Sequence, residues 1–177
     1  EAEDKGENEP TAMALSTLSE EGRPRTRFVL CKGVSKDGIR FFTNLNSAKG
    51  GEISRNPIAS VAFHWPKLNR QVRAQGKLDR ISEDDANEYF QSRNRLSKIG
   101  AWASKQSQPL ESRDALLESV QEFSDKFKSD VPRPPHWSGF HLVPDYWEFW
   151  QGHEGRLHDR WAIHPAGEGW ISWRLFP

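Results

Sequence analysis

The sequence has only one cysteine, no net charge and no long hydrophobic run, and these shortages exclude several classes of protein. Cys31 cannot form an intrachain disulfide, and its place in an apolar segment suggests a small core residue. The 25 basic and 25 acidic residues cancel, so no global field would recruit nucleic acid or an anionic membrane. No segment approaches the roughly 20 apolar residues of a membrane span, and no signal-peptide pattern opens the chain. We therefore expect a soluble, cytoplasmic protein in which any cationic site is local.

Several common catalytic motifs are also missing. The chain has no Gly-x-Ser-x-Gly elbow, no His-Glu-x-x-His and no paired-cysteine pattern, and its six histidines are scattered. The glycines of residues 33–38 have the spacing of a phosphate-binding P-loop, but the Lys-Ser/Thr that should follow is absent. We interpret this segment as a hairpin turn, and we expect neither a metal site nor a serine-type triad.

What the chain does contain is aromatic residues. Its 8 Trp and 10 Phe offset a hydrophobic content of 35%, so a packed core is expected. The length of 177 residues fits one domain, which we place at residues 10–177. Residues 1–9 are acidic and polar, and we expect them to be a disordered lead-in or the point where a longer natural N-terminus has been lost.

Turn signals divide the chain into short elements that predict a mainly β protein with helical insertions, as a barrel or a sandwich. Strands are predicted at residues 11–18, 25–32, 39–44, 58–65, 71–78, 139–143, 146–151, 158–163 and 170–175. Helices are predicted at residues 47–56, from Ser82 through Tyr89 and beyond, and at residues 112–128. The proline-rich residues 131–135 should cross the surface as an extended linker.

The run Arg-Leu-His-Asp-Arg at residues 156–160 is the most informative segment. In an extended strand, Arg156, His158 and Arg160 would line one face together. Such same-sign neighbours repel each other, so the arrangement favours a phosphate or an electron-rich ring opposite them. From spacing alone, a solvated strand face explains the run equally well.

Arg27 and Lys32 enclose the apolar residues 28–31. A regular strand would place the two cations on opposite faces because their separation is odd. Either Lys32 turns away at Gly33, or the two side chains serve different ligands. Two strand-end charges in water are the alternative.

Two more groups of residues suggest phosphate binding. Ser47 and Lys49 follow Thr43 at a predicted helix start, where free N–H groups could cradle a phosphate; an ordinary N-cap explains Ser47 but not Lys49. Three side chains recur at four-residue intervals and could bind a phosphate monoester from one stripe of a continuous helix, although a solvated helix face is the commoner explanation. They are Tyr89, Arg93 and Ser97.

A predicted strand carries a third polar group. Gln71, Arg73 and Gln75 alternate with the apolar Val72 and Ala74, so they should share one strand face. Amide groups there could bind the edge of a heterocycle, or simply face water.

Taken in order, these segments resemble the pyridoxamine 5′-phosphate oxidase family of flavin enzymes. The resemblance runs from about residue 9 to residue 177 and depends on residues 27–32, 42–44, 69–72, 89–90, 92–93, 105–107, 148–152 and 156–160. It implies an FMN-binding split β-barrel that forms a homodimer, with one FMN in each of two interface clefts. That fold agrees with the strand-rich pattern.

The resemblance also implies individual roles. One subunit would bind FMN through Arg27, Phe28, Val29, Leu30, Cys31, Lys32, Phe42, Thr43, Ser47, Lys49 and Gln71. The other subunit would complete that site through Gln106, Ser107, Trp150 and Arg160. The substrate phosphate would be bound by Lys32, Tyr89, Arg93 and Ser97, and the pyridine ring would lie against Arg156 and His158, which are the expected catalytic residues.

The activity that the resemblance implies is oxidation of pyridoxamine or pyridoxine 5′-phosphate at the 4′ carbon, giving pyridoxal 5′-phosphate. A hydride would move to N5 of FMN, and dioxygen would reoxidise the flavin and form hydrogen peroxide. Arg156 should position the substrate and stabilise charge, while His158 orients the ring or the reacting group. The alternatives are an oxidase acting on a phenazine precursor, or a non-catalytic protein that binds flavin or pyridoxal phosphate.

One position departs from the family pattern. The chain has Ser47-Ala48-Lys49 where the family typically has Ser-Arg-Lys, so one cationic donor to the FMN phosphate is missing. Loss of such a bond costs roughly 1.5–3 kcal/mol, or about one to two powers of ten in affinity, unless another group substitutes. We therefore predict looser FMN binding, which Ala48→Arg should tighten.

Overall fold

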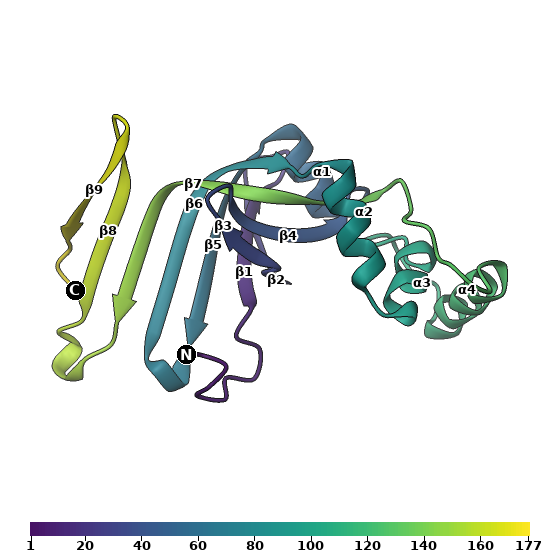
Figure 1. Cartoon of the computed structure of the whole chain (residues 1–177), viewed down its shortest axis with the longest axis horizontal. Coiled ribbons are helices and arrows are strands. Elements are labelled where there is room, and N and C mark those ends of the chain that lie inside the picture. Colours follow the sequence, from purple (N-terminus) through teal and green to yellow (C-terminus); the bar gives the residue numbers. More distant parts are fainter.

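The computed structural model describes all 177 residues, and its main feature is a curled antiparallel sheet of nine strands (Figure 1). The strands are β1 (Ala12–Leu18), β2 (Pro24–Leu30), β3 (Gly33–Ser35), β4 (Gly38–Asn44), β5 (Ile58–Trp65), β6 (Arg70–Arg80), β7 (Trp137–Gln151), β8 (Asp159–Ala166) and β9 (Gly169–Arg174). Their order is β2-β1-β5-β6-β7-β4-β3, and β8 and β9 continue the sheet from β7. The expected mainly β fold with helical insertions is confirmed.

Four α-helices and two short 3₁₀ turns interrupt the strands. The helices are α1 (Ala48–Arg55), α2 (Glu83–Ser92), α3 (Arg95–Ala103) and α4 (Arg113–Lys126), and the turns are η1 (Pro66–Leu68) and η2 (Glu154–Arg156). Ser47, Ser82, Asn94 and Ser112 each cap a helix by accepting a hydrogen bond from the backbone three residues on. None of the helices is both long and apolar enough to cross a lipid bilayer.

Strand β7 joins the two halves of the sheet. Its first residues pair with β4, its last residues pair with β8, and β6 follows it along most of its length. The sequence predicts two strands here because Pro144 interrupts the pattern, and this prediction is wrong. The strand continues because a bulge opposite Gln75 and Gly76 absorbs one residue. A Cβ at Gly76 would lie 2.1 Å from the carbonyl oxygen of Val143, so this close approach requires glycine.

The core consists of one large and one small apolar cluster. The large cluster combines residues of β1, β4, β5, β6, β7 and α1, and alternate residues of β1, among them Met13 and Leu15, point into it. The small cluster contains Phe90, Ile99 and Trp137 and anchors α2 and α3 to the start of β7. The helices are therefore fixed to the sheet at the place where β4 and β7 pair.

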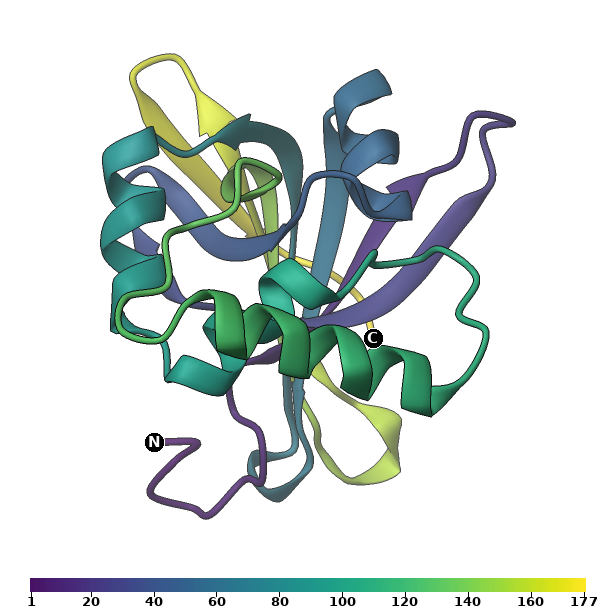
Figure 2. The same ribbon diagram turned by 90° about the vertical axis from the view of Figure 1, so that its right-hand side faces the viewer.

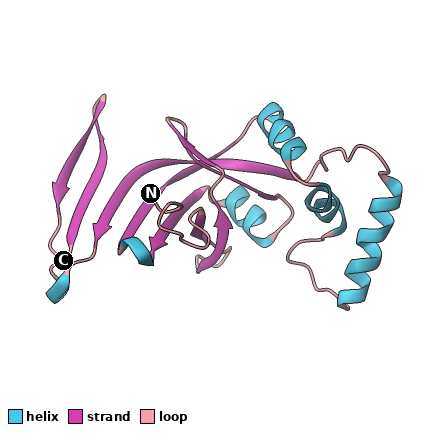
Figure 3. Ribbon diagram, turned by 60° about the horizontal axis from the view of Figure 1, so that its bottom comes forward, coloured by secondary structure: helices cyan, strands magenta, loops and turns pink.

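The elements are distributed along the long axis of the molecule. Helices α2, α3 and α4 lie at one end, and the hairpin of β8 and β9 lies at the other (Figures 1 and 3). Figure 2, viewed from the helical end, shows α4 lying in front of the curled sheet. Residues 1–9 contain turns only, and Glu1 forms an ion pair with Arg70 at 2.7 Å.

Candidate functional site

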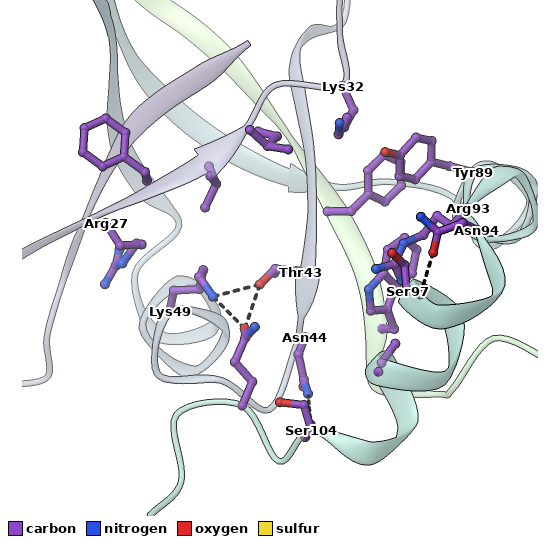
Figure 4. A pocket seen from close by; sticks show the side chains of 18 residues that line it. Arg27, Lys32, Thr43, Asn44, Lys49, Tyr89, Arg93, Asn94, Ser97 and Ser104 are labelled. Atoms are coloured by element: carbon purple, nitrogen blue, oxygen red, sulfur yellow. Dashed lines mark hydrogen bonds between the residues drawn. The ribbon is translucent and has the colours of Figure 1, made fainter. Parts of the chain in front are cut away.

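A cavity of about 720 Å³ lies between the sheet and the helices (Figure 4). Its walls come from β2, β4, the start of α1, and helices α2 and α3. Four of its lining side chains are cationic and none is a carboxylate; the cations are Arg27, Lys32, Lys49 and Arg93. Because the chain as a whole has no net charge, this local excess indicates a site for anions.

Lys49 forms the centre of one cationic end of the cavity. Its Nζ lies 3.0 Å from Oγ1 of Thr43 and 2.8 Å from Oε1 of Gln106, as the dashed lines in Figure 4 show. Burial lowers the pKa of Lys49, and the nearby charge of Arg27 lowers it further. Lys49 is thus a partly desolvated cation whose hydrogen-bond partners are neutral oxygens, beside the N-terminus of α1. An anion could complete this arrangement.

Arg27 lies at the same end of the cavity and forms an ion pair with the buried carboxylate of Glu52. Its Nη2 lies 2.8 Å from Oε2 of Glu52, which is only 3% exposed. Thr17 donates to the same oxygen at 2.5 Å, and Arg25 reaches Oε1 at 3.2 Å. Burial alone would raise the pKa of Glu52, but the hydrogen bonds from Thr17 and Arg27 and the charges of Arg27 and Arg25 hold it below its usual value.

Arg93 forms the opposite end of the cavity, together with Tyr89 and Ser97 (Figure 4). Its guanidinium carbon lies 4.8 Å from the ring centre of Trp137, a cation–π contact. Its Nη1 is buried without a hydrogen-bond partner, and burial lowers the pKa of Arg93. Because Arg93 lines the cavity and forms no ion pair within the chain, its guanidinium is available to a bound anion.

These three residues do not share one continuous helix, so that prediction is wrong. Helix α2 ends at Ser92, Arg93 has an extended backbone, and Asn94 caps α3 by accepting from the N–H of Ser97 at 2.8 Å. Asparagine favours such caps because its side chain competes for backbone hydrogen bonds. Tyr89, Arg93 and Ser97 nevertheless line the same cavity, because the two helices meet there.

The face predicted for residues 156–160 does not form. Arg156 ends the η2 turn with φ of 61°, and Nδ1 of His158 accepts a hydrogen bond from the backbone of His153 at 3.1 Å. Strand β8 begins only at Asp159, so of the three predicted residues only Arg160 lies in a strand. The turn replaces a strand because Gly155 and Arg156 both adopt positive φ.

This segment also lies far from the cavity of its own chain. The η2 turn and β8 are at the opposite end of the sheet from α2 and α3 (Figure 1). Trp150 contacts His158, with ring centres 4.7 Å apart. Trp150 also faces Gln71 across the pairing of β6 and β7. The residues at this end therefore form a second group, separate from the cavity.

A buried carboxylate organises the second group. Glu148 is 2% exposed, and its two oxygens accept from Nε and Nη2 of Arg160 at 3.0 and 3.1 Å. Arg73 and Tyr146 donate to the same carboxylate. Burial would raise the pKa of Glu148, but the hydrogen bonds and charges of Arg160 and Arg73 outweigh it, so the pKa is lowered.

The structure divides the predicted site residues into two sets. Those that line the cavity are Arg27, Phe28, Val29, Leu30, Lys32, Phe42, Thr43, Lys49, Tyr89, Arg93, Ser97 and Gln106. Those that do not are Cys31, Ser47, Gln71, Ser107, Trp150, Arg156, His158 and Arg160. Cys31 and Ser47 are buried beside the cavity, and Ser47 caps α1.

For two residues, the position in this chain can be compared with the subunit from which each was expected to bind FMN. Gln106 was expected to act in the partner's site, yet it contacts Lys49 of its own chain. Gln71 was expected to bind FMN from the same subunit as Arg27; it does not line the cavity of its own chain and lies opposite Trp150.

Sequence reasoning also missed several lining residues, namely Asn44, Asn94, Gly100, Ala101, Ser104 and Trp137. The only local signal for Asn94 is its position three residues before Ser97, which is typical of a helix cap. Trp137 lies beneath Arg93 because β7 begins there, and no spacing in the sequence indicates this contact.

Two sequence models of protein families match the chain. Residues 1–127 match the model described as pyridoxamine 5′-phosphate oxidase, and residues 137–177 match the one described as the pyridoxine 5′-phosphate oxidase C-terminal dimerisation region. The chain is 49% identical over 176 residues to the pyridoxine/pyridoxamine 5′-phosphate oxidase of Rhodospirillum rubrum, covering 96% of this chain and 88% of the relative. It is also 49% identical over 170 residues to the enzyme of the same name from Paraburkholderia phymatum, covering 96% of this chain and 80% of the relative.

Solved structures show the same architecture. PhzG from Burkholderia lata, in complex with tetrahydrophenazine-1-carboxylic acid, superposes with a TM-score of 0.91 at 29% identity, covering 96% of this chain and 84% of that one. A pyridoxamine 5′-phosphate oxidase-related, FMN-binding protein from Nostoc punctiforme has a TM-score of 0.79 at 19% identity, covering 99% of this chain and 94% of that one. The second similarity bears on the fold alone, and both agree with the predicted split barrel.

Proposed function

The chain belongs to the pyridoxamine 5′-phosphate oxidase family, and we propose that it oxidises pyridoxamine or pyridoxine 5′-phosphate to pyridoxal 5′-phosphate, with FMN as cofactor and O₂ as electron acceptor. The observation that carries this proposal is a carboxylate-free cavity with two cationic ends. Arg27 and Lys49 lie at one end, and Arg93 lies at the other (Figure 4). Two separate anion sites match two phosphate groups, one on the cofactor and one on the substrate.

The residues present fit FMN. Lys49 and the N-terminus of α1 offer a cation and free N–H groups to a phosphate, and Arg27 adds a guanidinium from β2. The apolar side chains of β2 that line the cavity supply a wall for a flat ring system. When bound, FMN would supply the redox chemistry, as the acceptor for hydride from the 4′ carbon and the source of electrons for O₂.

The side chains at the opposite end would bind and orient the substrate. The guanidinium of Arg93 would donate hydrogen bonds to the substrate phosphate, and the hydroxyls of Tyr89 and Ser97 would add further ones. Lys32 would neutralise further charge. Binding the phosphate in this way fixes the pyridine ring relative to the cofactor, which lowers the entropic barrier to reaction.

The segment that joins β7 to β8 lies at the far end of the chain from α2 and α3 (Figure 1). It carries Arg156 and His158, which would therefore reach a substrate only in a partner's cavity. We therefore propose a homodimer with shared active sites, which the match of residues 137–177 to a dimerisation region supports. In it, Arg156 would position the substrate so that the 4′ carbon faces the cofactor. Nδ1 of His158 is occupied by the backbone of His153, so Nε2 is the nitrogen available to the substrate. A cytoplasmic location stays a prediction.

The main alternative is an oxidase for a phenazine precursor, in view of the similarity to PhzG. Two observations favour the phosphorylated substrate. The identity to the pyridoxine/pyridoxamine 5′-phosphate oxidases is higher, at 49% against 29%. In addition, the cationic end formed by Lys32 and Arg93, with its adjacent hydroxyls, suits a phosphate monoester.

The first test is aerobic turnover of the purified protein supplemented with FMN. We expect aldehyde and hydrogen peroxide to form together from pyridoxine 5′-phosphate, and unphosphorylated pyridoxine to react at least about 100-fold less efficiently, since it lacks the group that Arg93 and Lys32 bind. A protein that binds FMN but produces neither product would instead be a binding protein. Similar rates with both compounds would contradict the assigned phosphate site.

A second test concerns Arg93. Arg93→Gln should raise KM for pyridoxine 5′-phosphate by about 10- to 100-fold, because a charge-assisted hydrogen bond to the phosphate is lost. The Kd for FMN should stay within about two-fold, since Arg93 lies at the other end of the cavity (Figure 4). Arg80→Gln is the matched control, because Arg80 pairs with Glu83 outside the cavity. An equal loss of FMN affinity would place Arg93 in the cofactor site instead.

A further inference from the structure

Within one chain, the end of the cavity assigned to the FMN phosphate has only two cations in its lining. A phosphate monoester carries about −1.5 to −2 at neutral pH. Arg27 and Lys49 supply two cations, but Glu52 lies directly against Arg27 and cancels one of them. Ala48, at the first position of α1, adds no charge where the family typically has arginine.

Arg25 lies where it can correct this deficit. It is two residues from Arg27 on β2, so both side chains leave the strand on the same face. Each guanidinium contacts a different oxygen of the same carboxylate: Arg25 lies 3.2 Å from Oε1 of Glu52, and Arg27 lies 2.8 Å from Oε2. The cluster then holds three cations, Arg25, Arg27 and Lys49, against one carboxylate, a formal charge of +2 instead of +1.

We propose that Arg25 substitutes for the cation missing at residue 48, by neutralising Glu52 so that the charges of Arg27 and Lys49 remain available to the FMN phosphate. Arg25 does not line the cavity, so it is a positioning residue that acts through Glu52. This inference rests on the proposed function, because the phosphate is that of FMN. It also explains how a chain with Ala48 can keep its cofactor.

The test is the affinity of the apoprotein for FMN, measured by quenching of flavin fluorescence. Arg25→Gln should raise Kd for FMN about five-fold at low ionic strength, and the effect should shrink as salt is added. Arg25→Lys should restore most of the affinity. The matched control is Arg55→Gln, because Arg55 is also 54% exposed and also forms an ion pair, with Glu20 at 3.4 Å, yet it does not contact Glu52. This control should change Kd less than two-fold.

Riboflavin, which lacks the phosphate, separates an electrostatic role from a structural one. Its Kd should be the same for wild type and Arg25→Gln. The double variant Arg25→Gln/Ala48→Arg should regain the lost FMN affinity, and the gain from Ala48→Arg should be larger in the Arg25→Gln background than in wild type.

Two results would overturn the role of Arg25. One is an effect no larger than that of Arg55→Gln, and the other is an equal loss of riboflavin affinity. Failure of the wild-type protein to bind FMN at all would instead overturn the proposed function.

Discussion

Replacing Arg156 by alanine is expected to lower kcat at least about 100-fold while leaving the FMN content of the purified protein unchanged. The Arg156 guanidinium forms no ion pair within its own chain, so it would be free to act in the partner's site of the proposed dimer. A side chain that orients the reacting carbon affects turnover more than it affects cofactor binding. Steady-state kinetics, together with the ratio of flavin to protein absorbance, measure the two effects separately.

The backbone at Arg156 provides a control for this experiment. Its φ of 61° is unfavourable for any residue with a Cβ, so alanine keeps the strain and glycine relieves it. Arg156→Gly should therefore lose as much turnover as Arg156→Ala, while its free energy of unfolding should be about 1 kcal/mol higher than that of the alanine variant. If turnover and FMN content fell together in both variants, Arg156 would be a cofactor or structural residue.

The local pattern of the sequence was sufficient to predict most strands and helix starts. Strand β5 occupies the predicted residues 58–65, and Ser47 and Ser82 cap helices as expected. Such features depend on neighbours within a few residues, such as alternating burial or a hydroxyl before a helical turn. The continuity of β7 could not be predicted in this way, because the bulge that accommodates Pro144 depends on Gly76 of the neighbouring strand.

The candidate site likewise has some contacts that are local in the sequence and others that join distant strands. Lys49 and Thr43 are close in the sequence, so both their contact and the start of α1 beside them could be inferred from the sequence. The two buried acids were not recognised as such, because their partners come from other strands. Glu52 binds arginines of β2, and Glu148 binds Arg73 and Arg160. No pattern in the sequence indicates that Arg160 forms an ion pair with Glu148.

The second large effect is expected at Glu148. Glu148→Ala should lower the free energy of unfolding by about 3 kcal/mol, because it removes a buried carboxylate and leaves Arg73 and Arg160 without their shared partner. Glu148→Gln keeps the shape and should cost less. Urea denaturation at neutral pH measures both values. The control is Glu20→Gln, which breaks an exposed ion pair with Arg55 and should cost no more than about 0.5 kcal/mol.

The pH dependence distinguishes lost charge from lost packing at Glu148. The pKa of this carboxyl in the folded protein lies below its ordinary value of 4.5, so its charge stabilises the fold above that pH. The contribution disappears as the pH falls through the folded-state pKa, because the unfolded chain binds the proton first. The difference in unfolding free energy between wild type and Glu148→Gln should therefore be largest at neutral pH and should shrink below about pH 4.5. A difference that stayed constant with pH would mean that Glu148 contributes through its shape, and that its charge is not what holds Arg160 in place.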